Sequence, residues 1–139
     1  MNRTEKLLLV EDEPEIRMAT QMRLTAMGYQ VEACGDGLAC LESVRNEVPD
    51  LVLMDLRMPR MDGISAIRQL SEDPALAKIP VIVLSASPGD LNLALDSGAR
   101  FFLTKPYQQR QLISAIESSL GRCSLSGSPM DRNGQAVAS

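Results

Sequence analysis

The sequence predicts an α/β domain built on a doubly wound parallel sheet of five strands and five helices. Five short apolar segments alternate along the chain with five segments whose apolar residues follow helical spacing. The apolar segments are hydrophobic at nearly every position, as strands are when helices cover both faces of their sheet. Alternation of strand and helix favours parallel pairing. A length of 139 residues with 45% hydrophobic content suits one domain with one core.

Each predicted strand is a short apolar run bounded by polar or turn residues. The five predicted strands are Lys6–Val10, 29–34, Leu51–Asp55, 80–84 and Phe101–Thr104. The predicted helices lie between and after them, at 13–27, from Asp36 to about residue 48, at 63–70, at 91–96 and at 108–120.

The helix boundaries follow from capping chemistry. Pro14 suits a first helical turn, where its missing N–H is not needed, and Gly28 ends that helix. Asp36 can cap the second helix, and Gly121 is a predicted C-cap of the last one. We expect one face of the first helix to carry Ile16, Ala19, Leu24 and Met27, and the second helix to carry Leu38, Leu41, Val44 and Val48.

Composition excludes several classes of function. The net charge is −4 and the pI about 4.8, whereas a nucleic-acid binder needs a basic face, so we expect no nucleic-acid partner. The chain has no histidine, which excludes Ser-His and Cys-His catalysis. Its cysteines, Cys34, Cys40 and Cys123, lack C-x-x-C spacing and read as buried thiols plus one tail thiol. No apolar run approaches the roughly 20 residues of a membrane span, so we expect a cytoplasmic protein with no membrane partner.

The composition changes after Gly121. Residues 122–139 are rich in Ser and Gly and lack periodicity, which predicts a disordered tail or a linker. The folded domain is therefore expected to span residues 1–121. We favour a stand-alone domain over one cut from a following output domain, because the chain ends in Gln-Ala-Val-Ala-Ser rather than in a motif.

Polar side chains stand at the ends of four of the five strands. Glu11 and Asp12 follow the first, Asp55 ends the third, Ser85 ends the fourth and Lys105 follows the fifth. In open parallel sheets the ligand crevice lies at the carboxyl ends of the strands, so these five side chains should converge there. Singly, each has an ordinary interpretation as a helix cap, loop acid, turn residue or surface charge. The presence of such side chains at the ends of four strands predicts a functional site at this edge of the sheet.

Three clustered carboxylates repel one another unless a cation lies among them. Oxygen ligands suit Mg²⁺ better than zinc or copper. A divalent cation, a lysine, a hydroxyl and a nucleophilic aspartate together form a receptor for a transferring phosphoryl group. The sequence therefore predicts phosphoryl transfer to an aspartate.

Four segments carry a resemblance to a known family. They read Leu-Leu-Leu-Val-Glu-Asp-Glu at 7–13, Pro-Asp-Leu-Val-Leu-Met-Asp-Leu-Arg-Met-Pro-Arg-Met-Asp-Gly at 49–63, Ile-Pro-Val-Ile-Val-Leu-Ser-Ala at 79–86 and Gly-Ala-Arg-Phe-Phe-Leu-Thr-Lys-Pro-Tyr at 98–107. With these segments the chain resembles the receiver domain of two-component response regulators, of the chemotaxis-type stand-alone kind. The resemblance implies a flavodoxin-like fold with strand order 2-1-3-4-5.

The resemblance assigns roles in phosphoryl transfer by position. Asp55 matches the phosphoacceptor. Asp12 and Asp55 match direct magnesium ligands, with Glu11 close by or acting through water. The backbone carbonyl of Arg57 matches the third protein ligand.

The remaining roles lie on the last two strands. Ser85 matches the switch hydroxyl, Lys105 the phosphoryl-binding lysine and Phe102 the switch aromatic. Pro106 matches a position where the preceding peptide bond is typically cis. The chain departs from the family in having Glu11 for the usual Asp, Ser85 for Thr and Phe102 for Tyr. The segment from 85 to 105 is also about two residues shorter than the family pattern.

The resemblance implies a switch that takes its phosphoryl group from a sensor histidine kinase or phosphotransfer protein and then changes its contacts with a downstream target. It implies a monomer or a phosphorylation-dependent dimer and no turnover of an external substrate. The alternative is an aspartate-nucleophile phosphatase. That class needs an acid two residues after the nucleophile, where this chain has Arg57. A flavin site is disfavoured because the acids at 11–13 would repel phosphate.

Overall fold

The computed structural model describes residues 4–56 and 62–121, which form a three-layer α/β domain. The sheet has five parallel strands in the order β2-β1-β3-β4-β5. This confirms the fold class and the strand order expected from the sequence. The strands are β1 (Lys6–Val10), β2 (Gln30–Cys34), β3 (Leu51–Asp55), β4 (Val81–Ser85) and β5 (Phe101–Thr104). The predicted tail, residues 122–139, lies outside the described residues.

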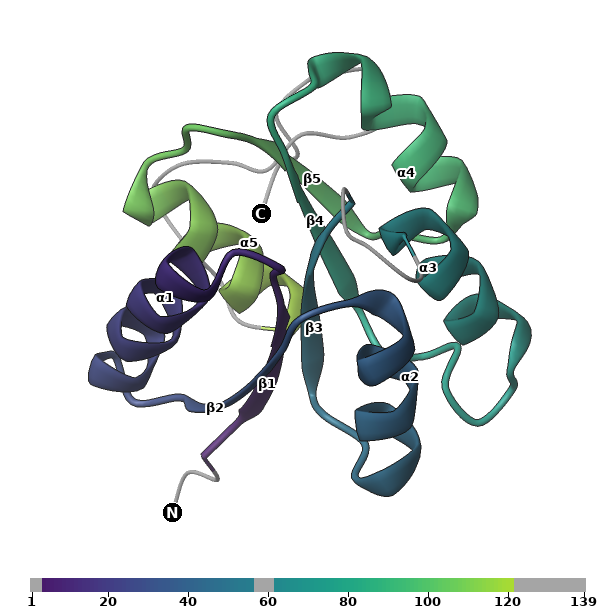
Figure 1. The fold of residues 1–139 in the computed structure, drawn as a ribbon, viewed down its shortest axis with the longest axis horizontal. Helices are drawn as coiled ribbons and strands as arrows, with labels where there is room; N and C mark the ends of the chain where they lie inside the picture. The colour runs from purple at the N-terminus through teal and green to yellow at the C-terminus, as the bar shows by residue number, and fades with distance from the viewer. Residues whose placement is uncertain (1–3, 57–61, 122–139) are drawn as a thin grey trace.

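Helices cover both faces of the sheet (Figure 1). The helices are α1 (Pro14–Ala26), α2 (Gly37–Asn46), α3 (Gly63–Glu72), α4 (Leu91–Ser97) and α5 (Gln109–Ser119), with a 3₁₀ turn, η1 (Pro88–Asp90), directly before α4. Helices α1 and α5 lie on one face of the sheet, and α2, α3 and α4 lie on the other.

Successive residues of each central strand point to opposite faces and so divide the core in two. On the α1/α5 side, Leu7 and Leu9 of β1 pack in one cluster with Leu24 and Ile116. On the other side, Leu8 and Val10 pack in a second cluster with residues of α2, α3 and α4. Burial on both faces explains why these strands are continuously apolar in sequence.

Capping residues act largely where the sequence places them. The Asp36 carboxylate accepts a hydrogen bond of 2.8 Å from the Ala39 N–H at the start of α2. Asp62 accepts one of 2.8 Å from the Ser65 N–H at the start of α3. Gly28 and Gly121 adopt positive φ angles of 102° and 83° just after α1 and α5, a conformation that glycine adopts without steric cost.

The predicted apolar faces of the first two helices were partly wrong. In α1, Ile16 is 49% exposed and Ala19 is exposed, while Thr20 is buried beside Leu24. Helix α2 ends at Asn46, so Val48 lies beyond it and is 56% exposed. Helical spacing located each helix, but it did not decide which of its apolar residues face the sheet. Several apolar residues follow the same period, and only part of the apolar face contacts the sheet.

None of the helices in the described part of the chain combines the length and the hydrophobicity of a membrane-spanning segment. Cys40 is a buried free thiol, as predicted, whereas Cys34 is a free thiol that is only half-buried. Burial raises the pKa of Cys34 to about 11 and that of Cys40 to about 12. Cys123 lies outside the described residues.

The start of α3 lies against the end of β3 at Gly63. The Gly63 N–H donates a 3.1 Å hydrogen bond to the Leu56 carbonyl. A Cβ atom at this glycine would lie 2.5 Å from the Asp55 carbonyl oxygen and 2.8 Å from the Leu56 Cα. Both neighbours are backbone atoms, so only a residue without a side chain lets α3 approach the strand end this closely.

We predict that Gly63→Ala lowers the free energy of unfolding by about 2 kcal/mol, because a backbone shift must relieve the overlap. Gly89→Ala is the matched control, since a Cβ there meets nothing within 4 Å. Urea denaturation of both variants measures the difference. Equal stability of the two variants would contradict the close approach at Gly63.

Candidate functional site

The predicted site residues converge at the carboxyl edge of the sheet because parallel strands all end there. Glu11 follows β1, and its N–H extends the strand pairing by a 3.0 Å bond to the Cys34 carbonyl. Asp55 is the last residue of β3. Lys105 follows β5, and its N–H donates a 2.7 Å bond to the Ser85 carbonyl at the end of β4.

Three carboxylates form one cluster at this edge. Ligand oxygens of Glu11, Asp12 and Asp55 all lie within 4.8 Å of one another. Glu11 and Asp55 are buried, and Asp12 is half-buried. Negative charges at this separation and burial repel one another strongly.

Lys105 supplies the positive charge that the described residues place against this cluster. Its Nζ lies 3.1 Å from Glu11 Oε1, within hydrogen-bond distance, and 3.6 Å from Asp55 Oδ2. Among residues 4–56 and 62–121, this one ammonium faces three carboxylates, so these residues by themselves leave an excess of negative charge.

Burial and the neighbouring charges shift the pKa values of both Glu11 and Lys105. Burial and the charge of Asp55 raise the pKa of Glu11, and the hydrogen bond from Lys105 only partly opposes them. Burial works against the charged form of Lys105, but the carboxylates of Asp55 and Glu11 outweigh it and raise the pKa of Lys105. The ammonium therefore stays protonated at neutral pH, which a phosphoryl-binding group requires.

The loop after β1 is fixed by bonds to Glu11. Glu11 accepts, at its carboxylate oxygen Oε2, a hydrogen bond of 3.3 Å from the Glu13 N–H. Its carbonyl oxygen accepts one of 2.9 Å from the Arg17 guanidinium. Sequence reasoning missed Arg17, which lies in the first turn of α1 and reaches back to the Glu11 carbonyl before the helix, a contact with no periodic signature.

Ser85 lies at the end of β4 with its side chain only 1% exposed. Its hydroxyl donates a 3.0 Å hydrogen bond to Asp90 Oδ2 and accepts one of 3.0 Å from the Ser87 N–H. The sequence did not indicate Asp90 as a site residue, since a pairing five residues along an irregular loop has no periodic signature.

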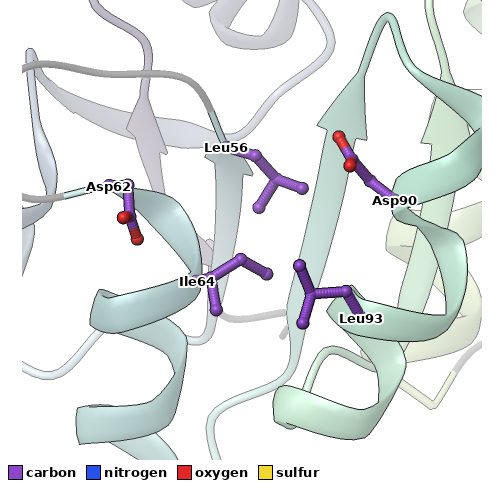
Figure 2. Close-up of a pocket in the computed structure, with 5 residues that line it drawn as sticks. All are labelled: Leu56, Asp62, Ile64, Asp90 and Leu93. Atoms are coloured by element: carbon purple, nitrogen blue, oxygen red, sulfur yellow. The ribbon is translucent and has the colours of Figure 1, made fainter.

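A cavity of about 190 Å³ lies between α3 and α4, beside this loop. Figure 2 shows the side chains of Leu56, Ile64 and Leu93 directed into it and Asp90 entering from the α4 side. Asp62 completes the lining on the α3 side. The cavity joins the end of β3, which carries Asp55, to the start of α4.

The other predicted residues are placed as follows. Phe102 is 1% exposed and lies in the core on the α2–α4 side. The Lys105–Pro106 peptide bond is cis. Arg57, the predicted backbone ligand, lies outside the described residues.

The cluster of three carboxylates fits a hard divalent cation. Its donors are all oxygens, they lie close enough to share one ion, and their charge exceeds what Lys105 supplies. Mg²⁺ binds in this way, through a few carboxylates with remaining positions open to water or phosphate oxygens. Asp12, Asp55 and Glu11 are the residues that would hold it.

Comparison with known proteins places the chain in a family. Residues 7–117 match the response regulator receiver domain. Over 118 residues the chain is 40% identical to the transcriptional regulatory protein CseB of Streptomyces coelicolor, covering 84% of this chain and 49% of CseB. The chain thus spans about half the length of that relative.

Solved structures agree with this match. The receiver domain of the Pseudomonas aeruginosa sensor histidine kinase PA1611, solved with a magnesium ion coordinated in its active site cleft, has a TM-score of 0.79 and 30% identity, covering 86% of this chain and 99% of that one. The Vibrio cholerae chemotaxis response regulator CheY4 has a TM-score of 0.78 and 26% identity, covering 85% and 100%. With its strand order, its acidic strand ends and a family match over nearly all of the described residues, the chain belongs to the response regulator receiver domains of two-component signalling.

Proposed function

We propose that this domain is a phosphorylation switch that accepts a phosphoryl group on Asp55 with the help of Mg²⁺. The observation that carries the proposal is the contact of Lys105 with both Asp55 and Glu11 beside the three-carboxylate cluster. This arrangement places a nucleophilic oxygen beside an ammonium, and the carboxylates would hold Mg²⁺ as the second source of positive charge that phosphoryl transfer requires.

Each residue has a defined task in the reaction. A carboxylate oxygen of Asp55 attacks the phosphorus of a phosphohistidine, the new O–P bond forms, and the N–P bond breaks with its electron pair going to the imidazole nitrogen. Asp12 and Asp55, with Glu11 close by, would hold Mg²⁺, which would neutralise charge on the phosphoryl oxygens. Lys105, freed from part of its contact with Glu11, binds another phosphoryl oxygen. The Arg57 carbonyl is proposed as a further metal ligand.

The phosphodonor is proposed to be a sensor histidine kinase or phosphotransfer protein, which must approach Asp55 at the surface. An open groove of about 450 Å³ runs beside Lys105 between α1 and the start of α5, lined by Ile16, Arg23 and Tyr107 among others. Exposed apolar side chains on α1, Ile16 among them, would contact such a partner. A target would respond to the face formed by α4, β5 and α5, and the domain would act as a monomer or as a phosphorylation-dependent dimer in a cytoplasmic setting.

An aspartate-nucleophile phosphatase remains the second candidate from the sequence, and the described site does not favour it. Such an enzyme needs a proton donor near the nucleophile for the leaving group. Among the described residues Lys105 contacts Asp55, and its raised pKa makes it a poor acid.

We predict that acetyl phosphate labels the wild-type protein only when Mg²⁺ is present, and that Asp55→Asn abolishes the label, because the amide is not a nucleophile. Phos-tag electrophoresis and intact mass measure the label. Asp62→Asn is the control, since Asp62 caps α3 and is not one of the three clustered carboxylates. Labelling of Asp55→Asn at the wild-type rate would overturn the proposal.

We predict that Asp12→Asn stabilises the Mg²⁺-free protein by about 0.5 kcal/mol, because one of three repelling charges is removed. The same change should abolish most of the rise in melting temperature that Mg²⁺ gives the wild type. Differential scanning calorimetry with and without Mg²⁺ measures both effects, and Glu72→Gln on the exposed face of α3 is the control. An equal Mg²⁺-induced rise in the wild type and in Asp12→Asn would exclude Asp12 as a ligand.

A further inference from the structure

The hydroxyl of Ser85 is already engaged in the described structure. It has one proton, which it donates to Asp90 Oδ2 at 3.0 Å, and its oxygen accepts the Ser87 N–H at 3.0 Å. The side chain is 1% exposed, so water cannot easily replace either partner. Before the hydroxyl can donate to any other acceptor, its bond to Asp90 must break.

Asp90 occupies an unusual place for a capping residue. It ends η1 and directly precedes the first helical turn of α4, with helical backbone angles (φ −81°, ψ −4°) in place of the extended angles of a usual N-cap. The structure describes that whole turn, and the Asp90 side chain makes no cap hydrogen bond to it. In Figure 2 the carboxylate is directed instead over the end of the adjacent strand, β4, where Ser85 lies.

We propose that Asp90 is a positioning residue that holds the Ser85 hydroxyl in the unphosphorylated state and couples its release to α4. The inference rests on the proposed function of Asp55 and concerns the regulation of that same site. A phosphoryl group on Asp55 presents three acceptor oxygens and about two negative charges. Ser85 can donate to Asp90 or to the phosphoryl group, but not to both at once.

The coupling follows from where Asp90 sits in the chain. Its side chain contacts Ser85 while its backbone begins α4, so the hydroxyl and the helix are joined through one residue. When Ser85 turns to the phosphoryl group, the Asp90 carboxylate loses the hydrogen bond from the Ser85 hydroxyl, and this change occurs at the residue from which α4 begins. The cavity of about 190 Å³ between α3 and α4 lies directly beside this joint and is partly lined by Asp90 and Leu93, which gives the start of α4 room to move.

The segment between Ser85 and Asp90 is short, so the position of the Ser85 hydroxyl is closely coupled to the start of α4. Only Ala86 to Gly89 separate the two partners, and the Asp90 N–H also bonds the Ser87 carbonyl at 3.0 Å. A longer loop would let the helix move without disturbing the hydroxyl. Here a movement of the Ser85 hydroxyl is transmitted to α4 through the few residues between them.

The test is the affinity of the protein for beryllofluoride, a mimic of the phosphoryl group, with Mg²⁺ in excess. Asp90→Ala removes the competing acceptor, so the affinity is expected to rise by about tenfold, the size of a net hydrogen bond to a charged group. Asp90→Asn keeps a neutral acceptor and is expected to raise it by about threefold. Asp96→Asn removes a charge from the exposed face of the same helix and is the control for a general electrostatic effect.

A second measurement separates release of the hydroxyl from simple loss of a nearby negative charge. In a Ser85→Ala background no hydroxyl is left to release, so adding Asp90→Ala should give no further gain. Amide NMR supplies the structural readout: in Asp90→Ala the Ser87 N–H and the first amides of α4 should shift toward their positions in the beryllofluoride complex.

The outcomes are distinguishable. Tighter binding by Asp90→Ala that vanishes in the Ser85→Ala background supports the inference. Unchanged or weaker binding by Asp90→Ala and Asp90→Asn, or an equal gain in both backgrounds, overturns it. If the wild-type protein itself does not bind beryllofluoride with Mg²⁺, the proposed function of Asp55 fails and this inference fails with it.

Discussion

The structure depends on one electrostatic constraint: three carboxylates are held within 4.8 Å of one another at the buried end of a hydrophobic sheet. The sheet imposes this proximity, because β1 and β3 are neighbours and their ends cannot separate without loss of strand pairing. This repulsion must be offset by positive charge close to the cluster. Lys105, directly after β5, offsets part of it, while burial and the charge of Asp55 raise the pKa of Glu11. Such an arrangement is expected at a site that binds a cation and an anion together.

The same constraint organises the surroundings. The backbone of α3 approaches the end of β3 closely enough to exclude any side chain at Gly63, which fixes the position of Asp55. On the far side, Ser85 and Asp90 tie the end of β4 to the start of α4. Rigid packing on the α3 side therefore limits the structural response to a change of charge at Asp55. The response can propagate on the α4 side, where hydrogen bonds and a cavity replace close packing.

The sequence predicted the sheet well because continuous apolar runs bounded by polar residues have few alternative structures. It also indicated Glu11, Asp55, Ser85 and Lys105 together, since topology alone places strand ends on one edge. It failed where tertiary context decides. Helical spacing allowed Ile16 to face the sheet, whereas the structure leaves it exposed and buries Thr20. The bond between Ser85 and Asp90 depends on the path of an irregular loop, which no period encodes.

The most direct test of the account is a crystal structure of the protein with Mg²⁺ and beryllofluoride. We predict beryllium bonded to a carboxylate oxygen of Asp55, and Mg²⁺ about 2.1 Å from oxygens of Asp12 and Asp55. We also predict Lys105 Nζ in contact with a fluoride. Beryllium on a different side chain, or Mg²⁺ bound away from these carboxylates, would contradict the claim that this cluster is a receptor for a phosphoryl group.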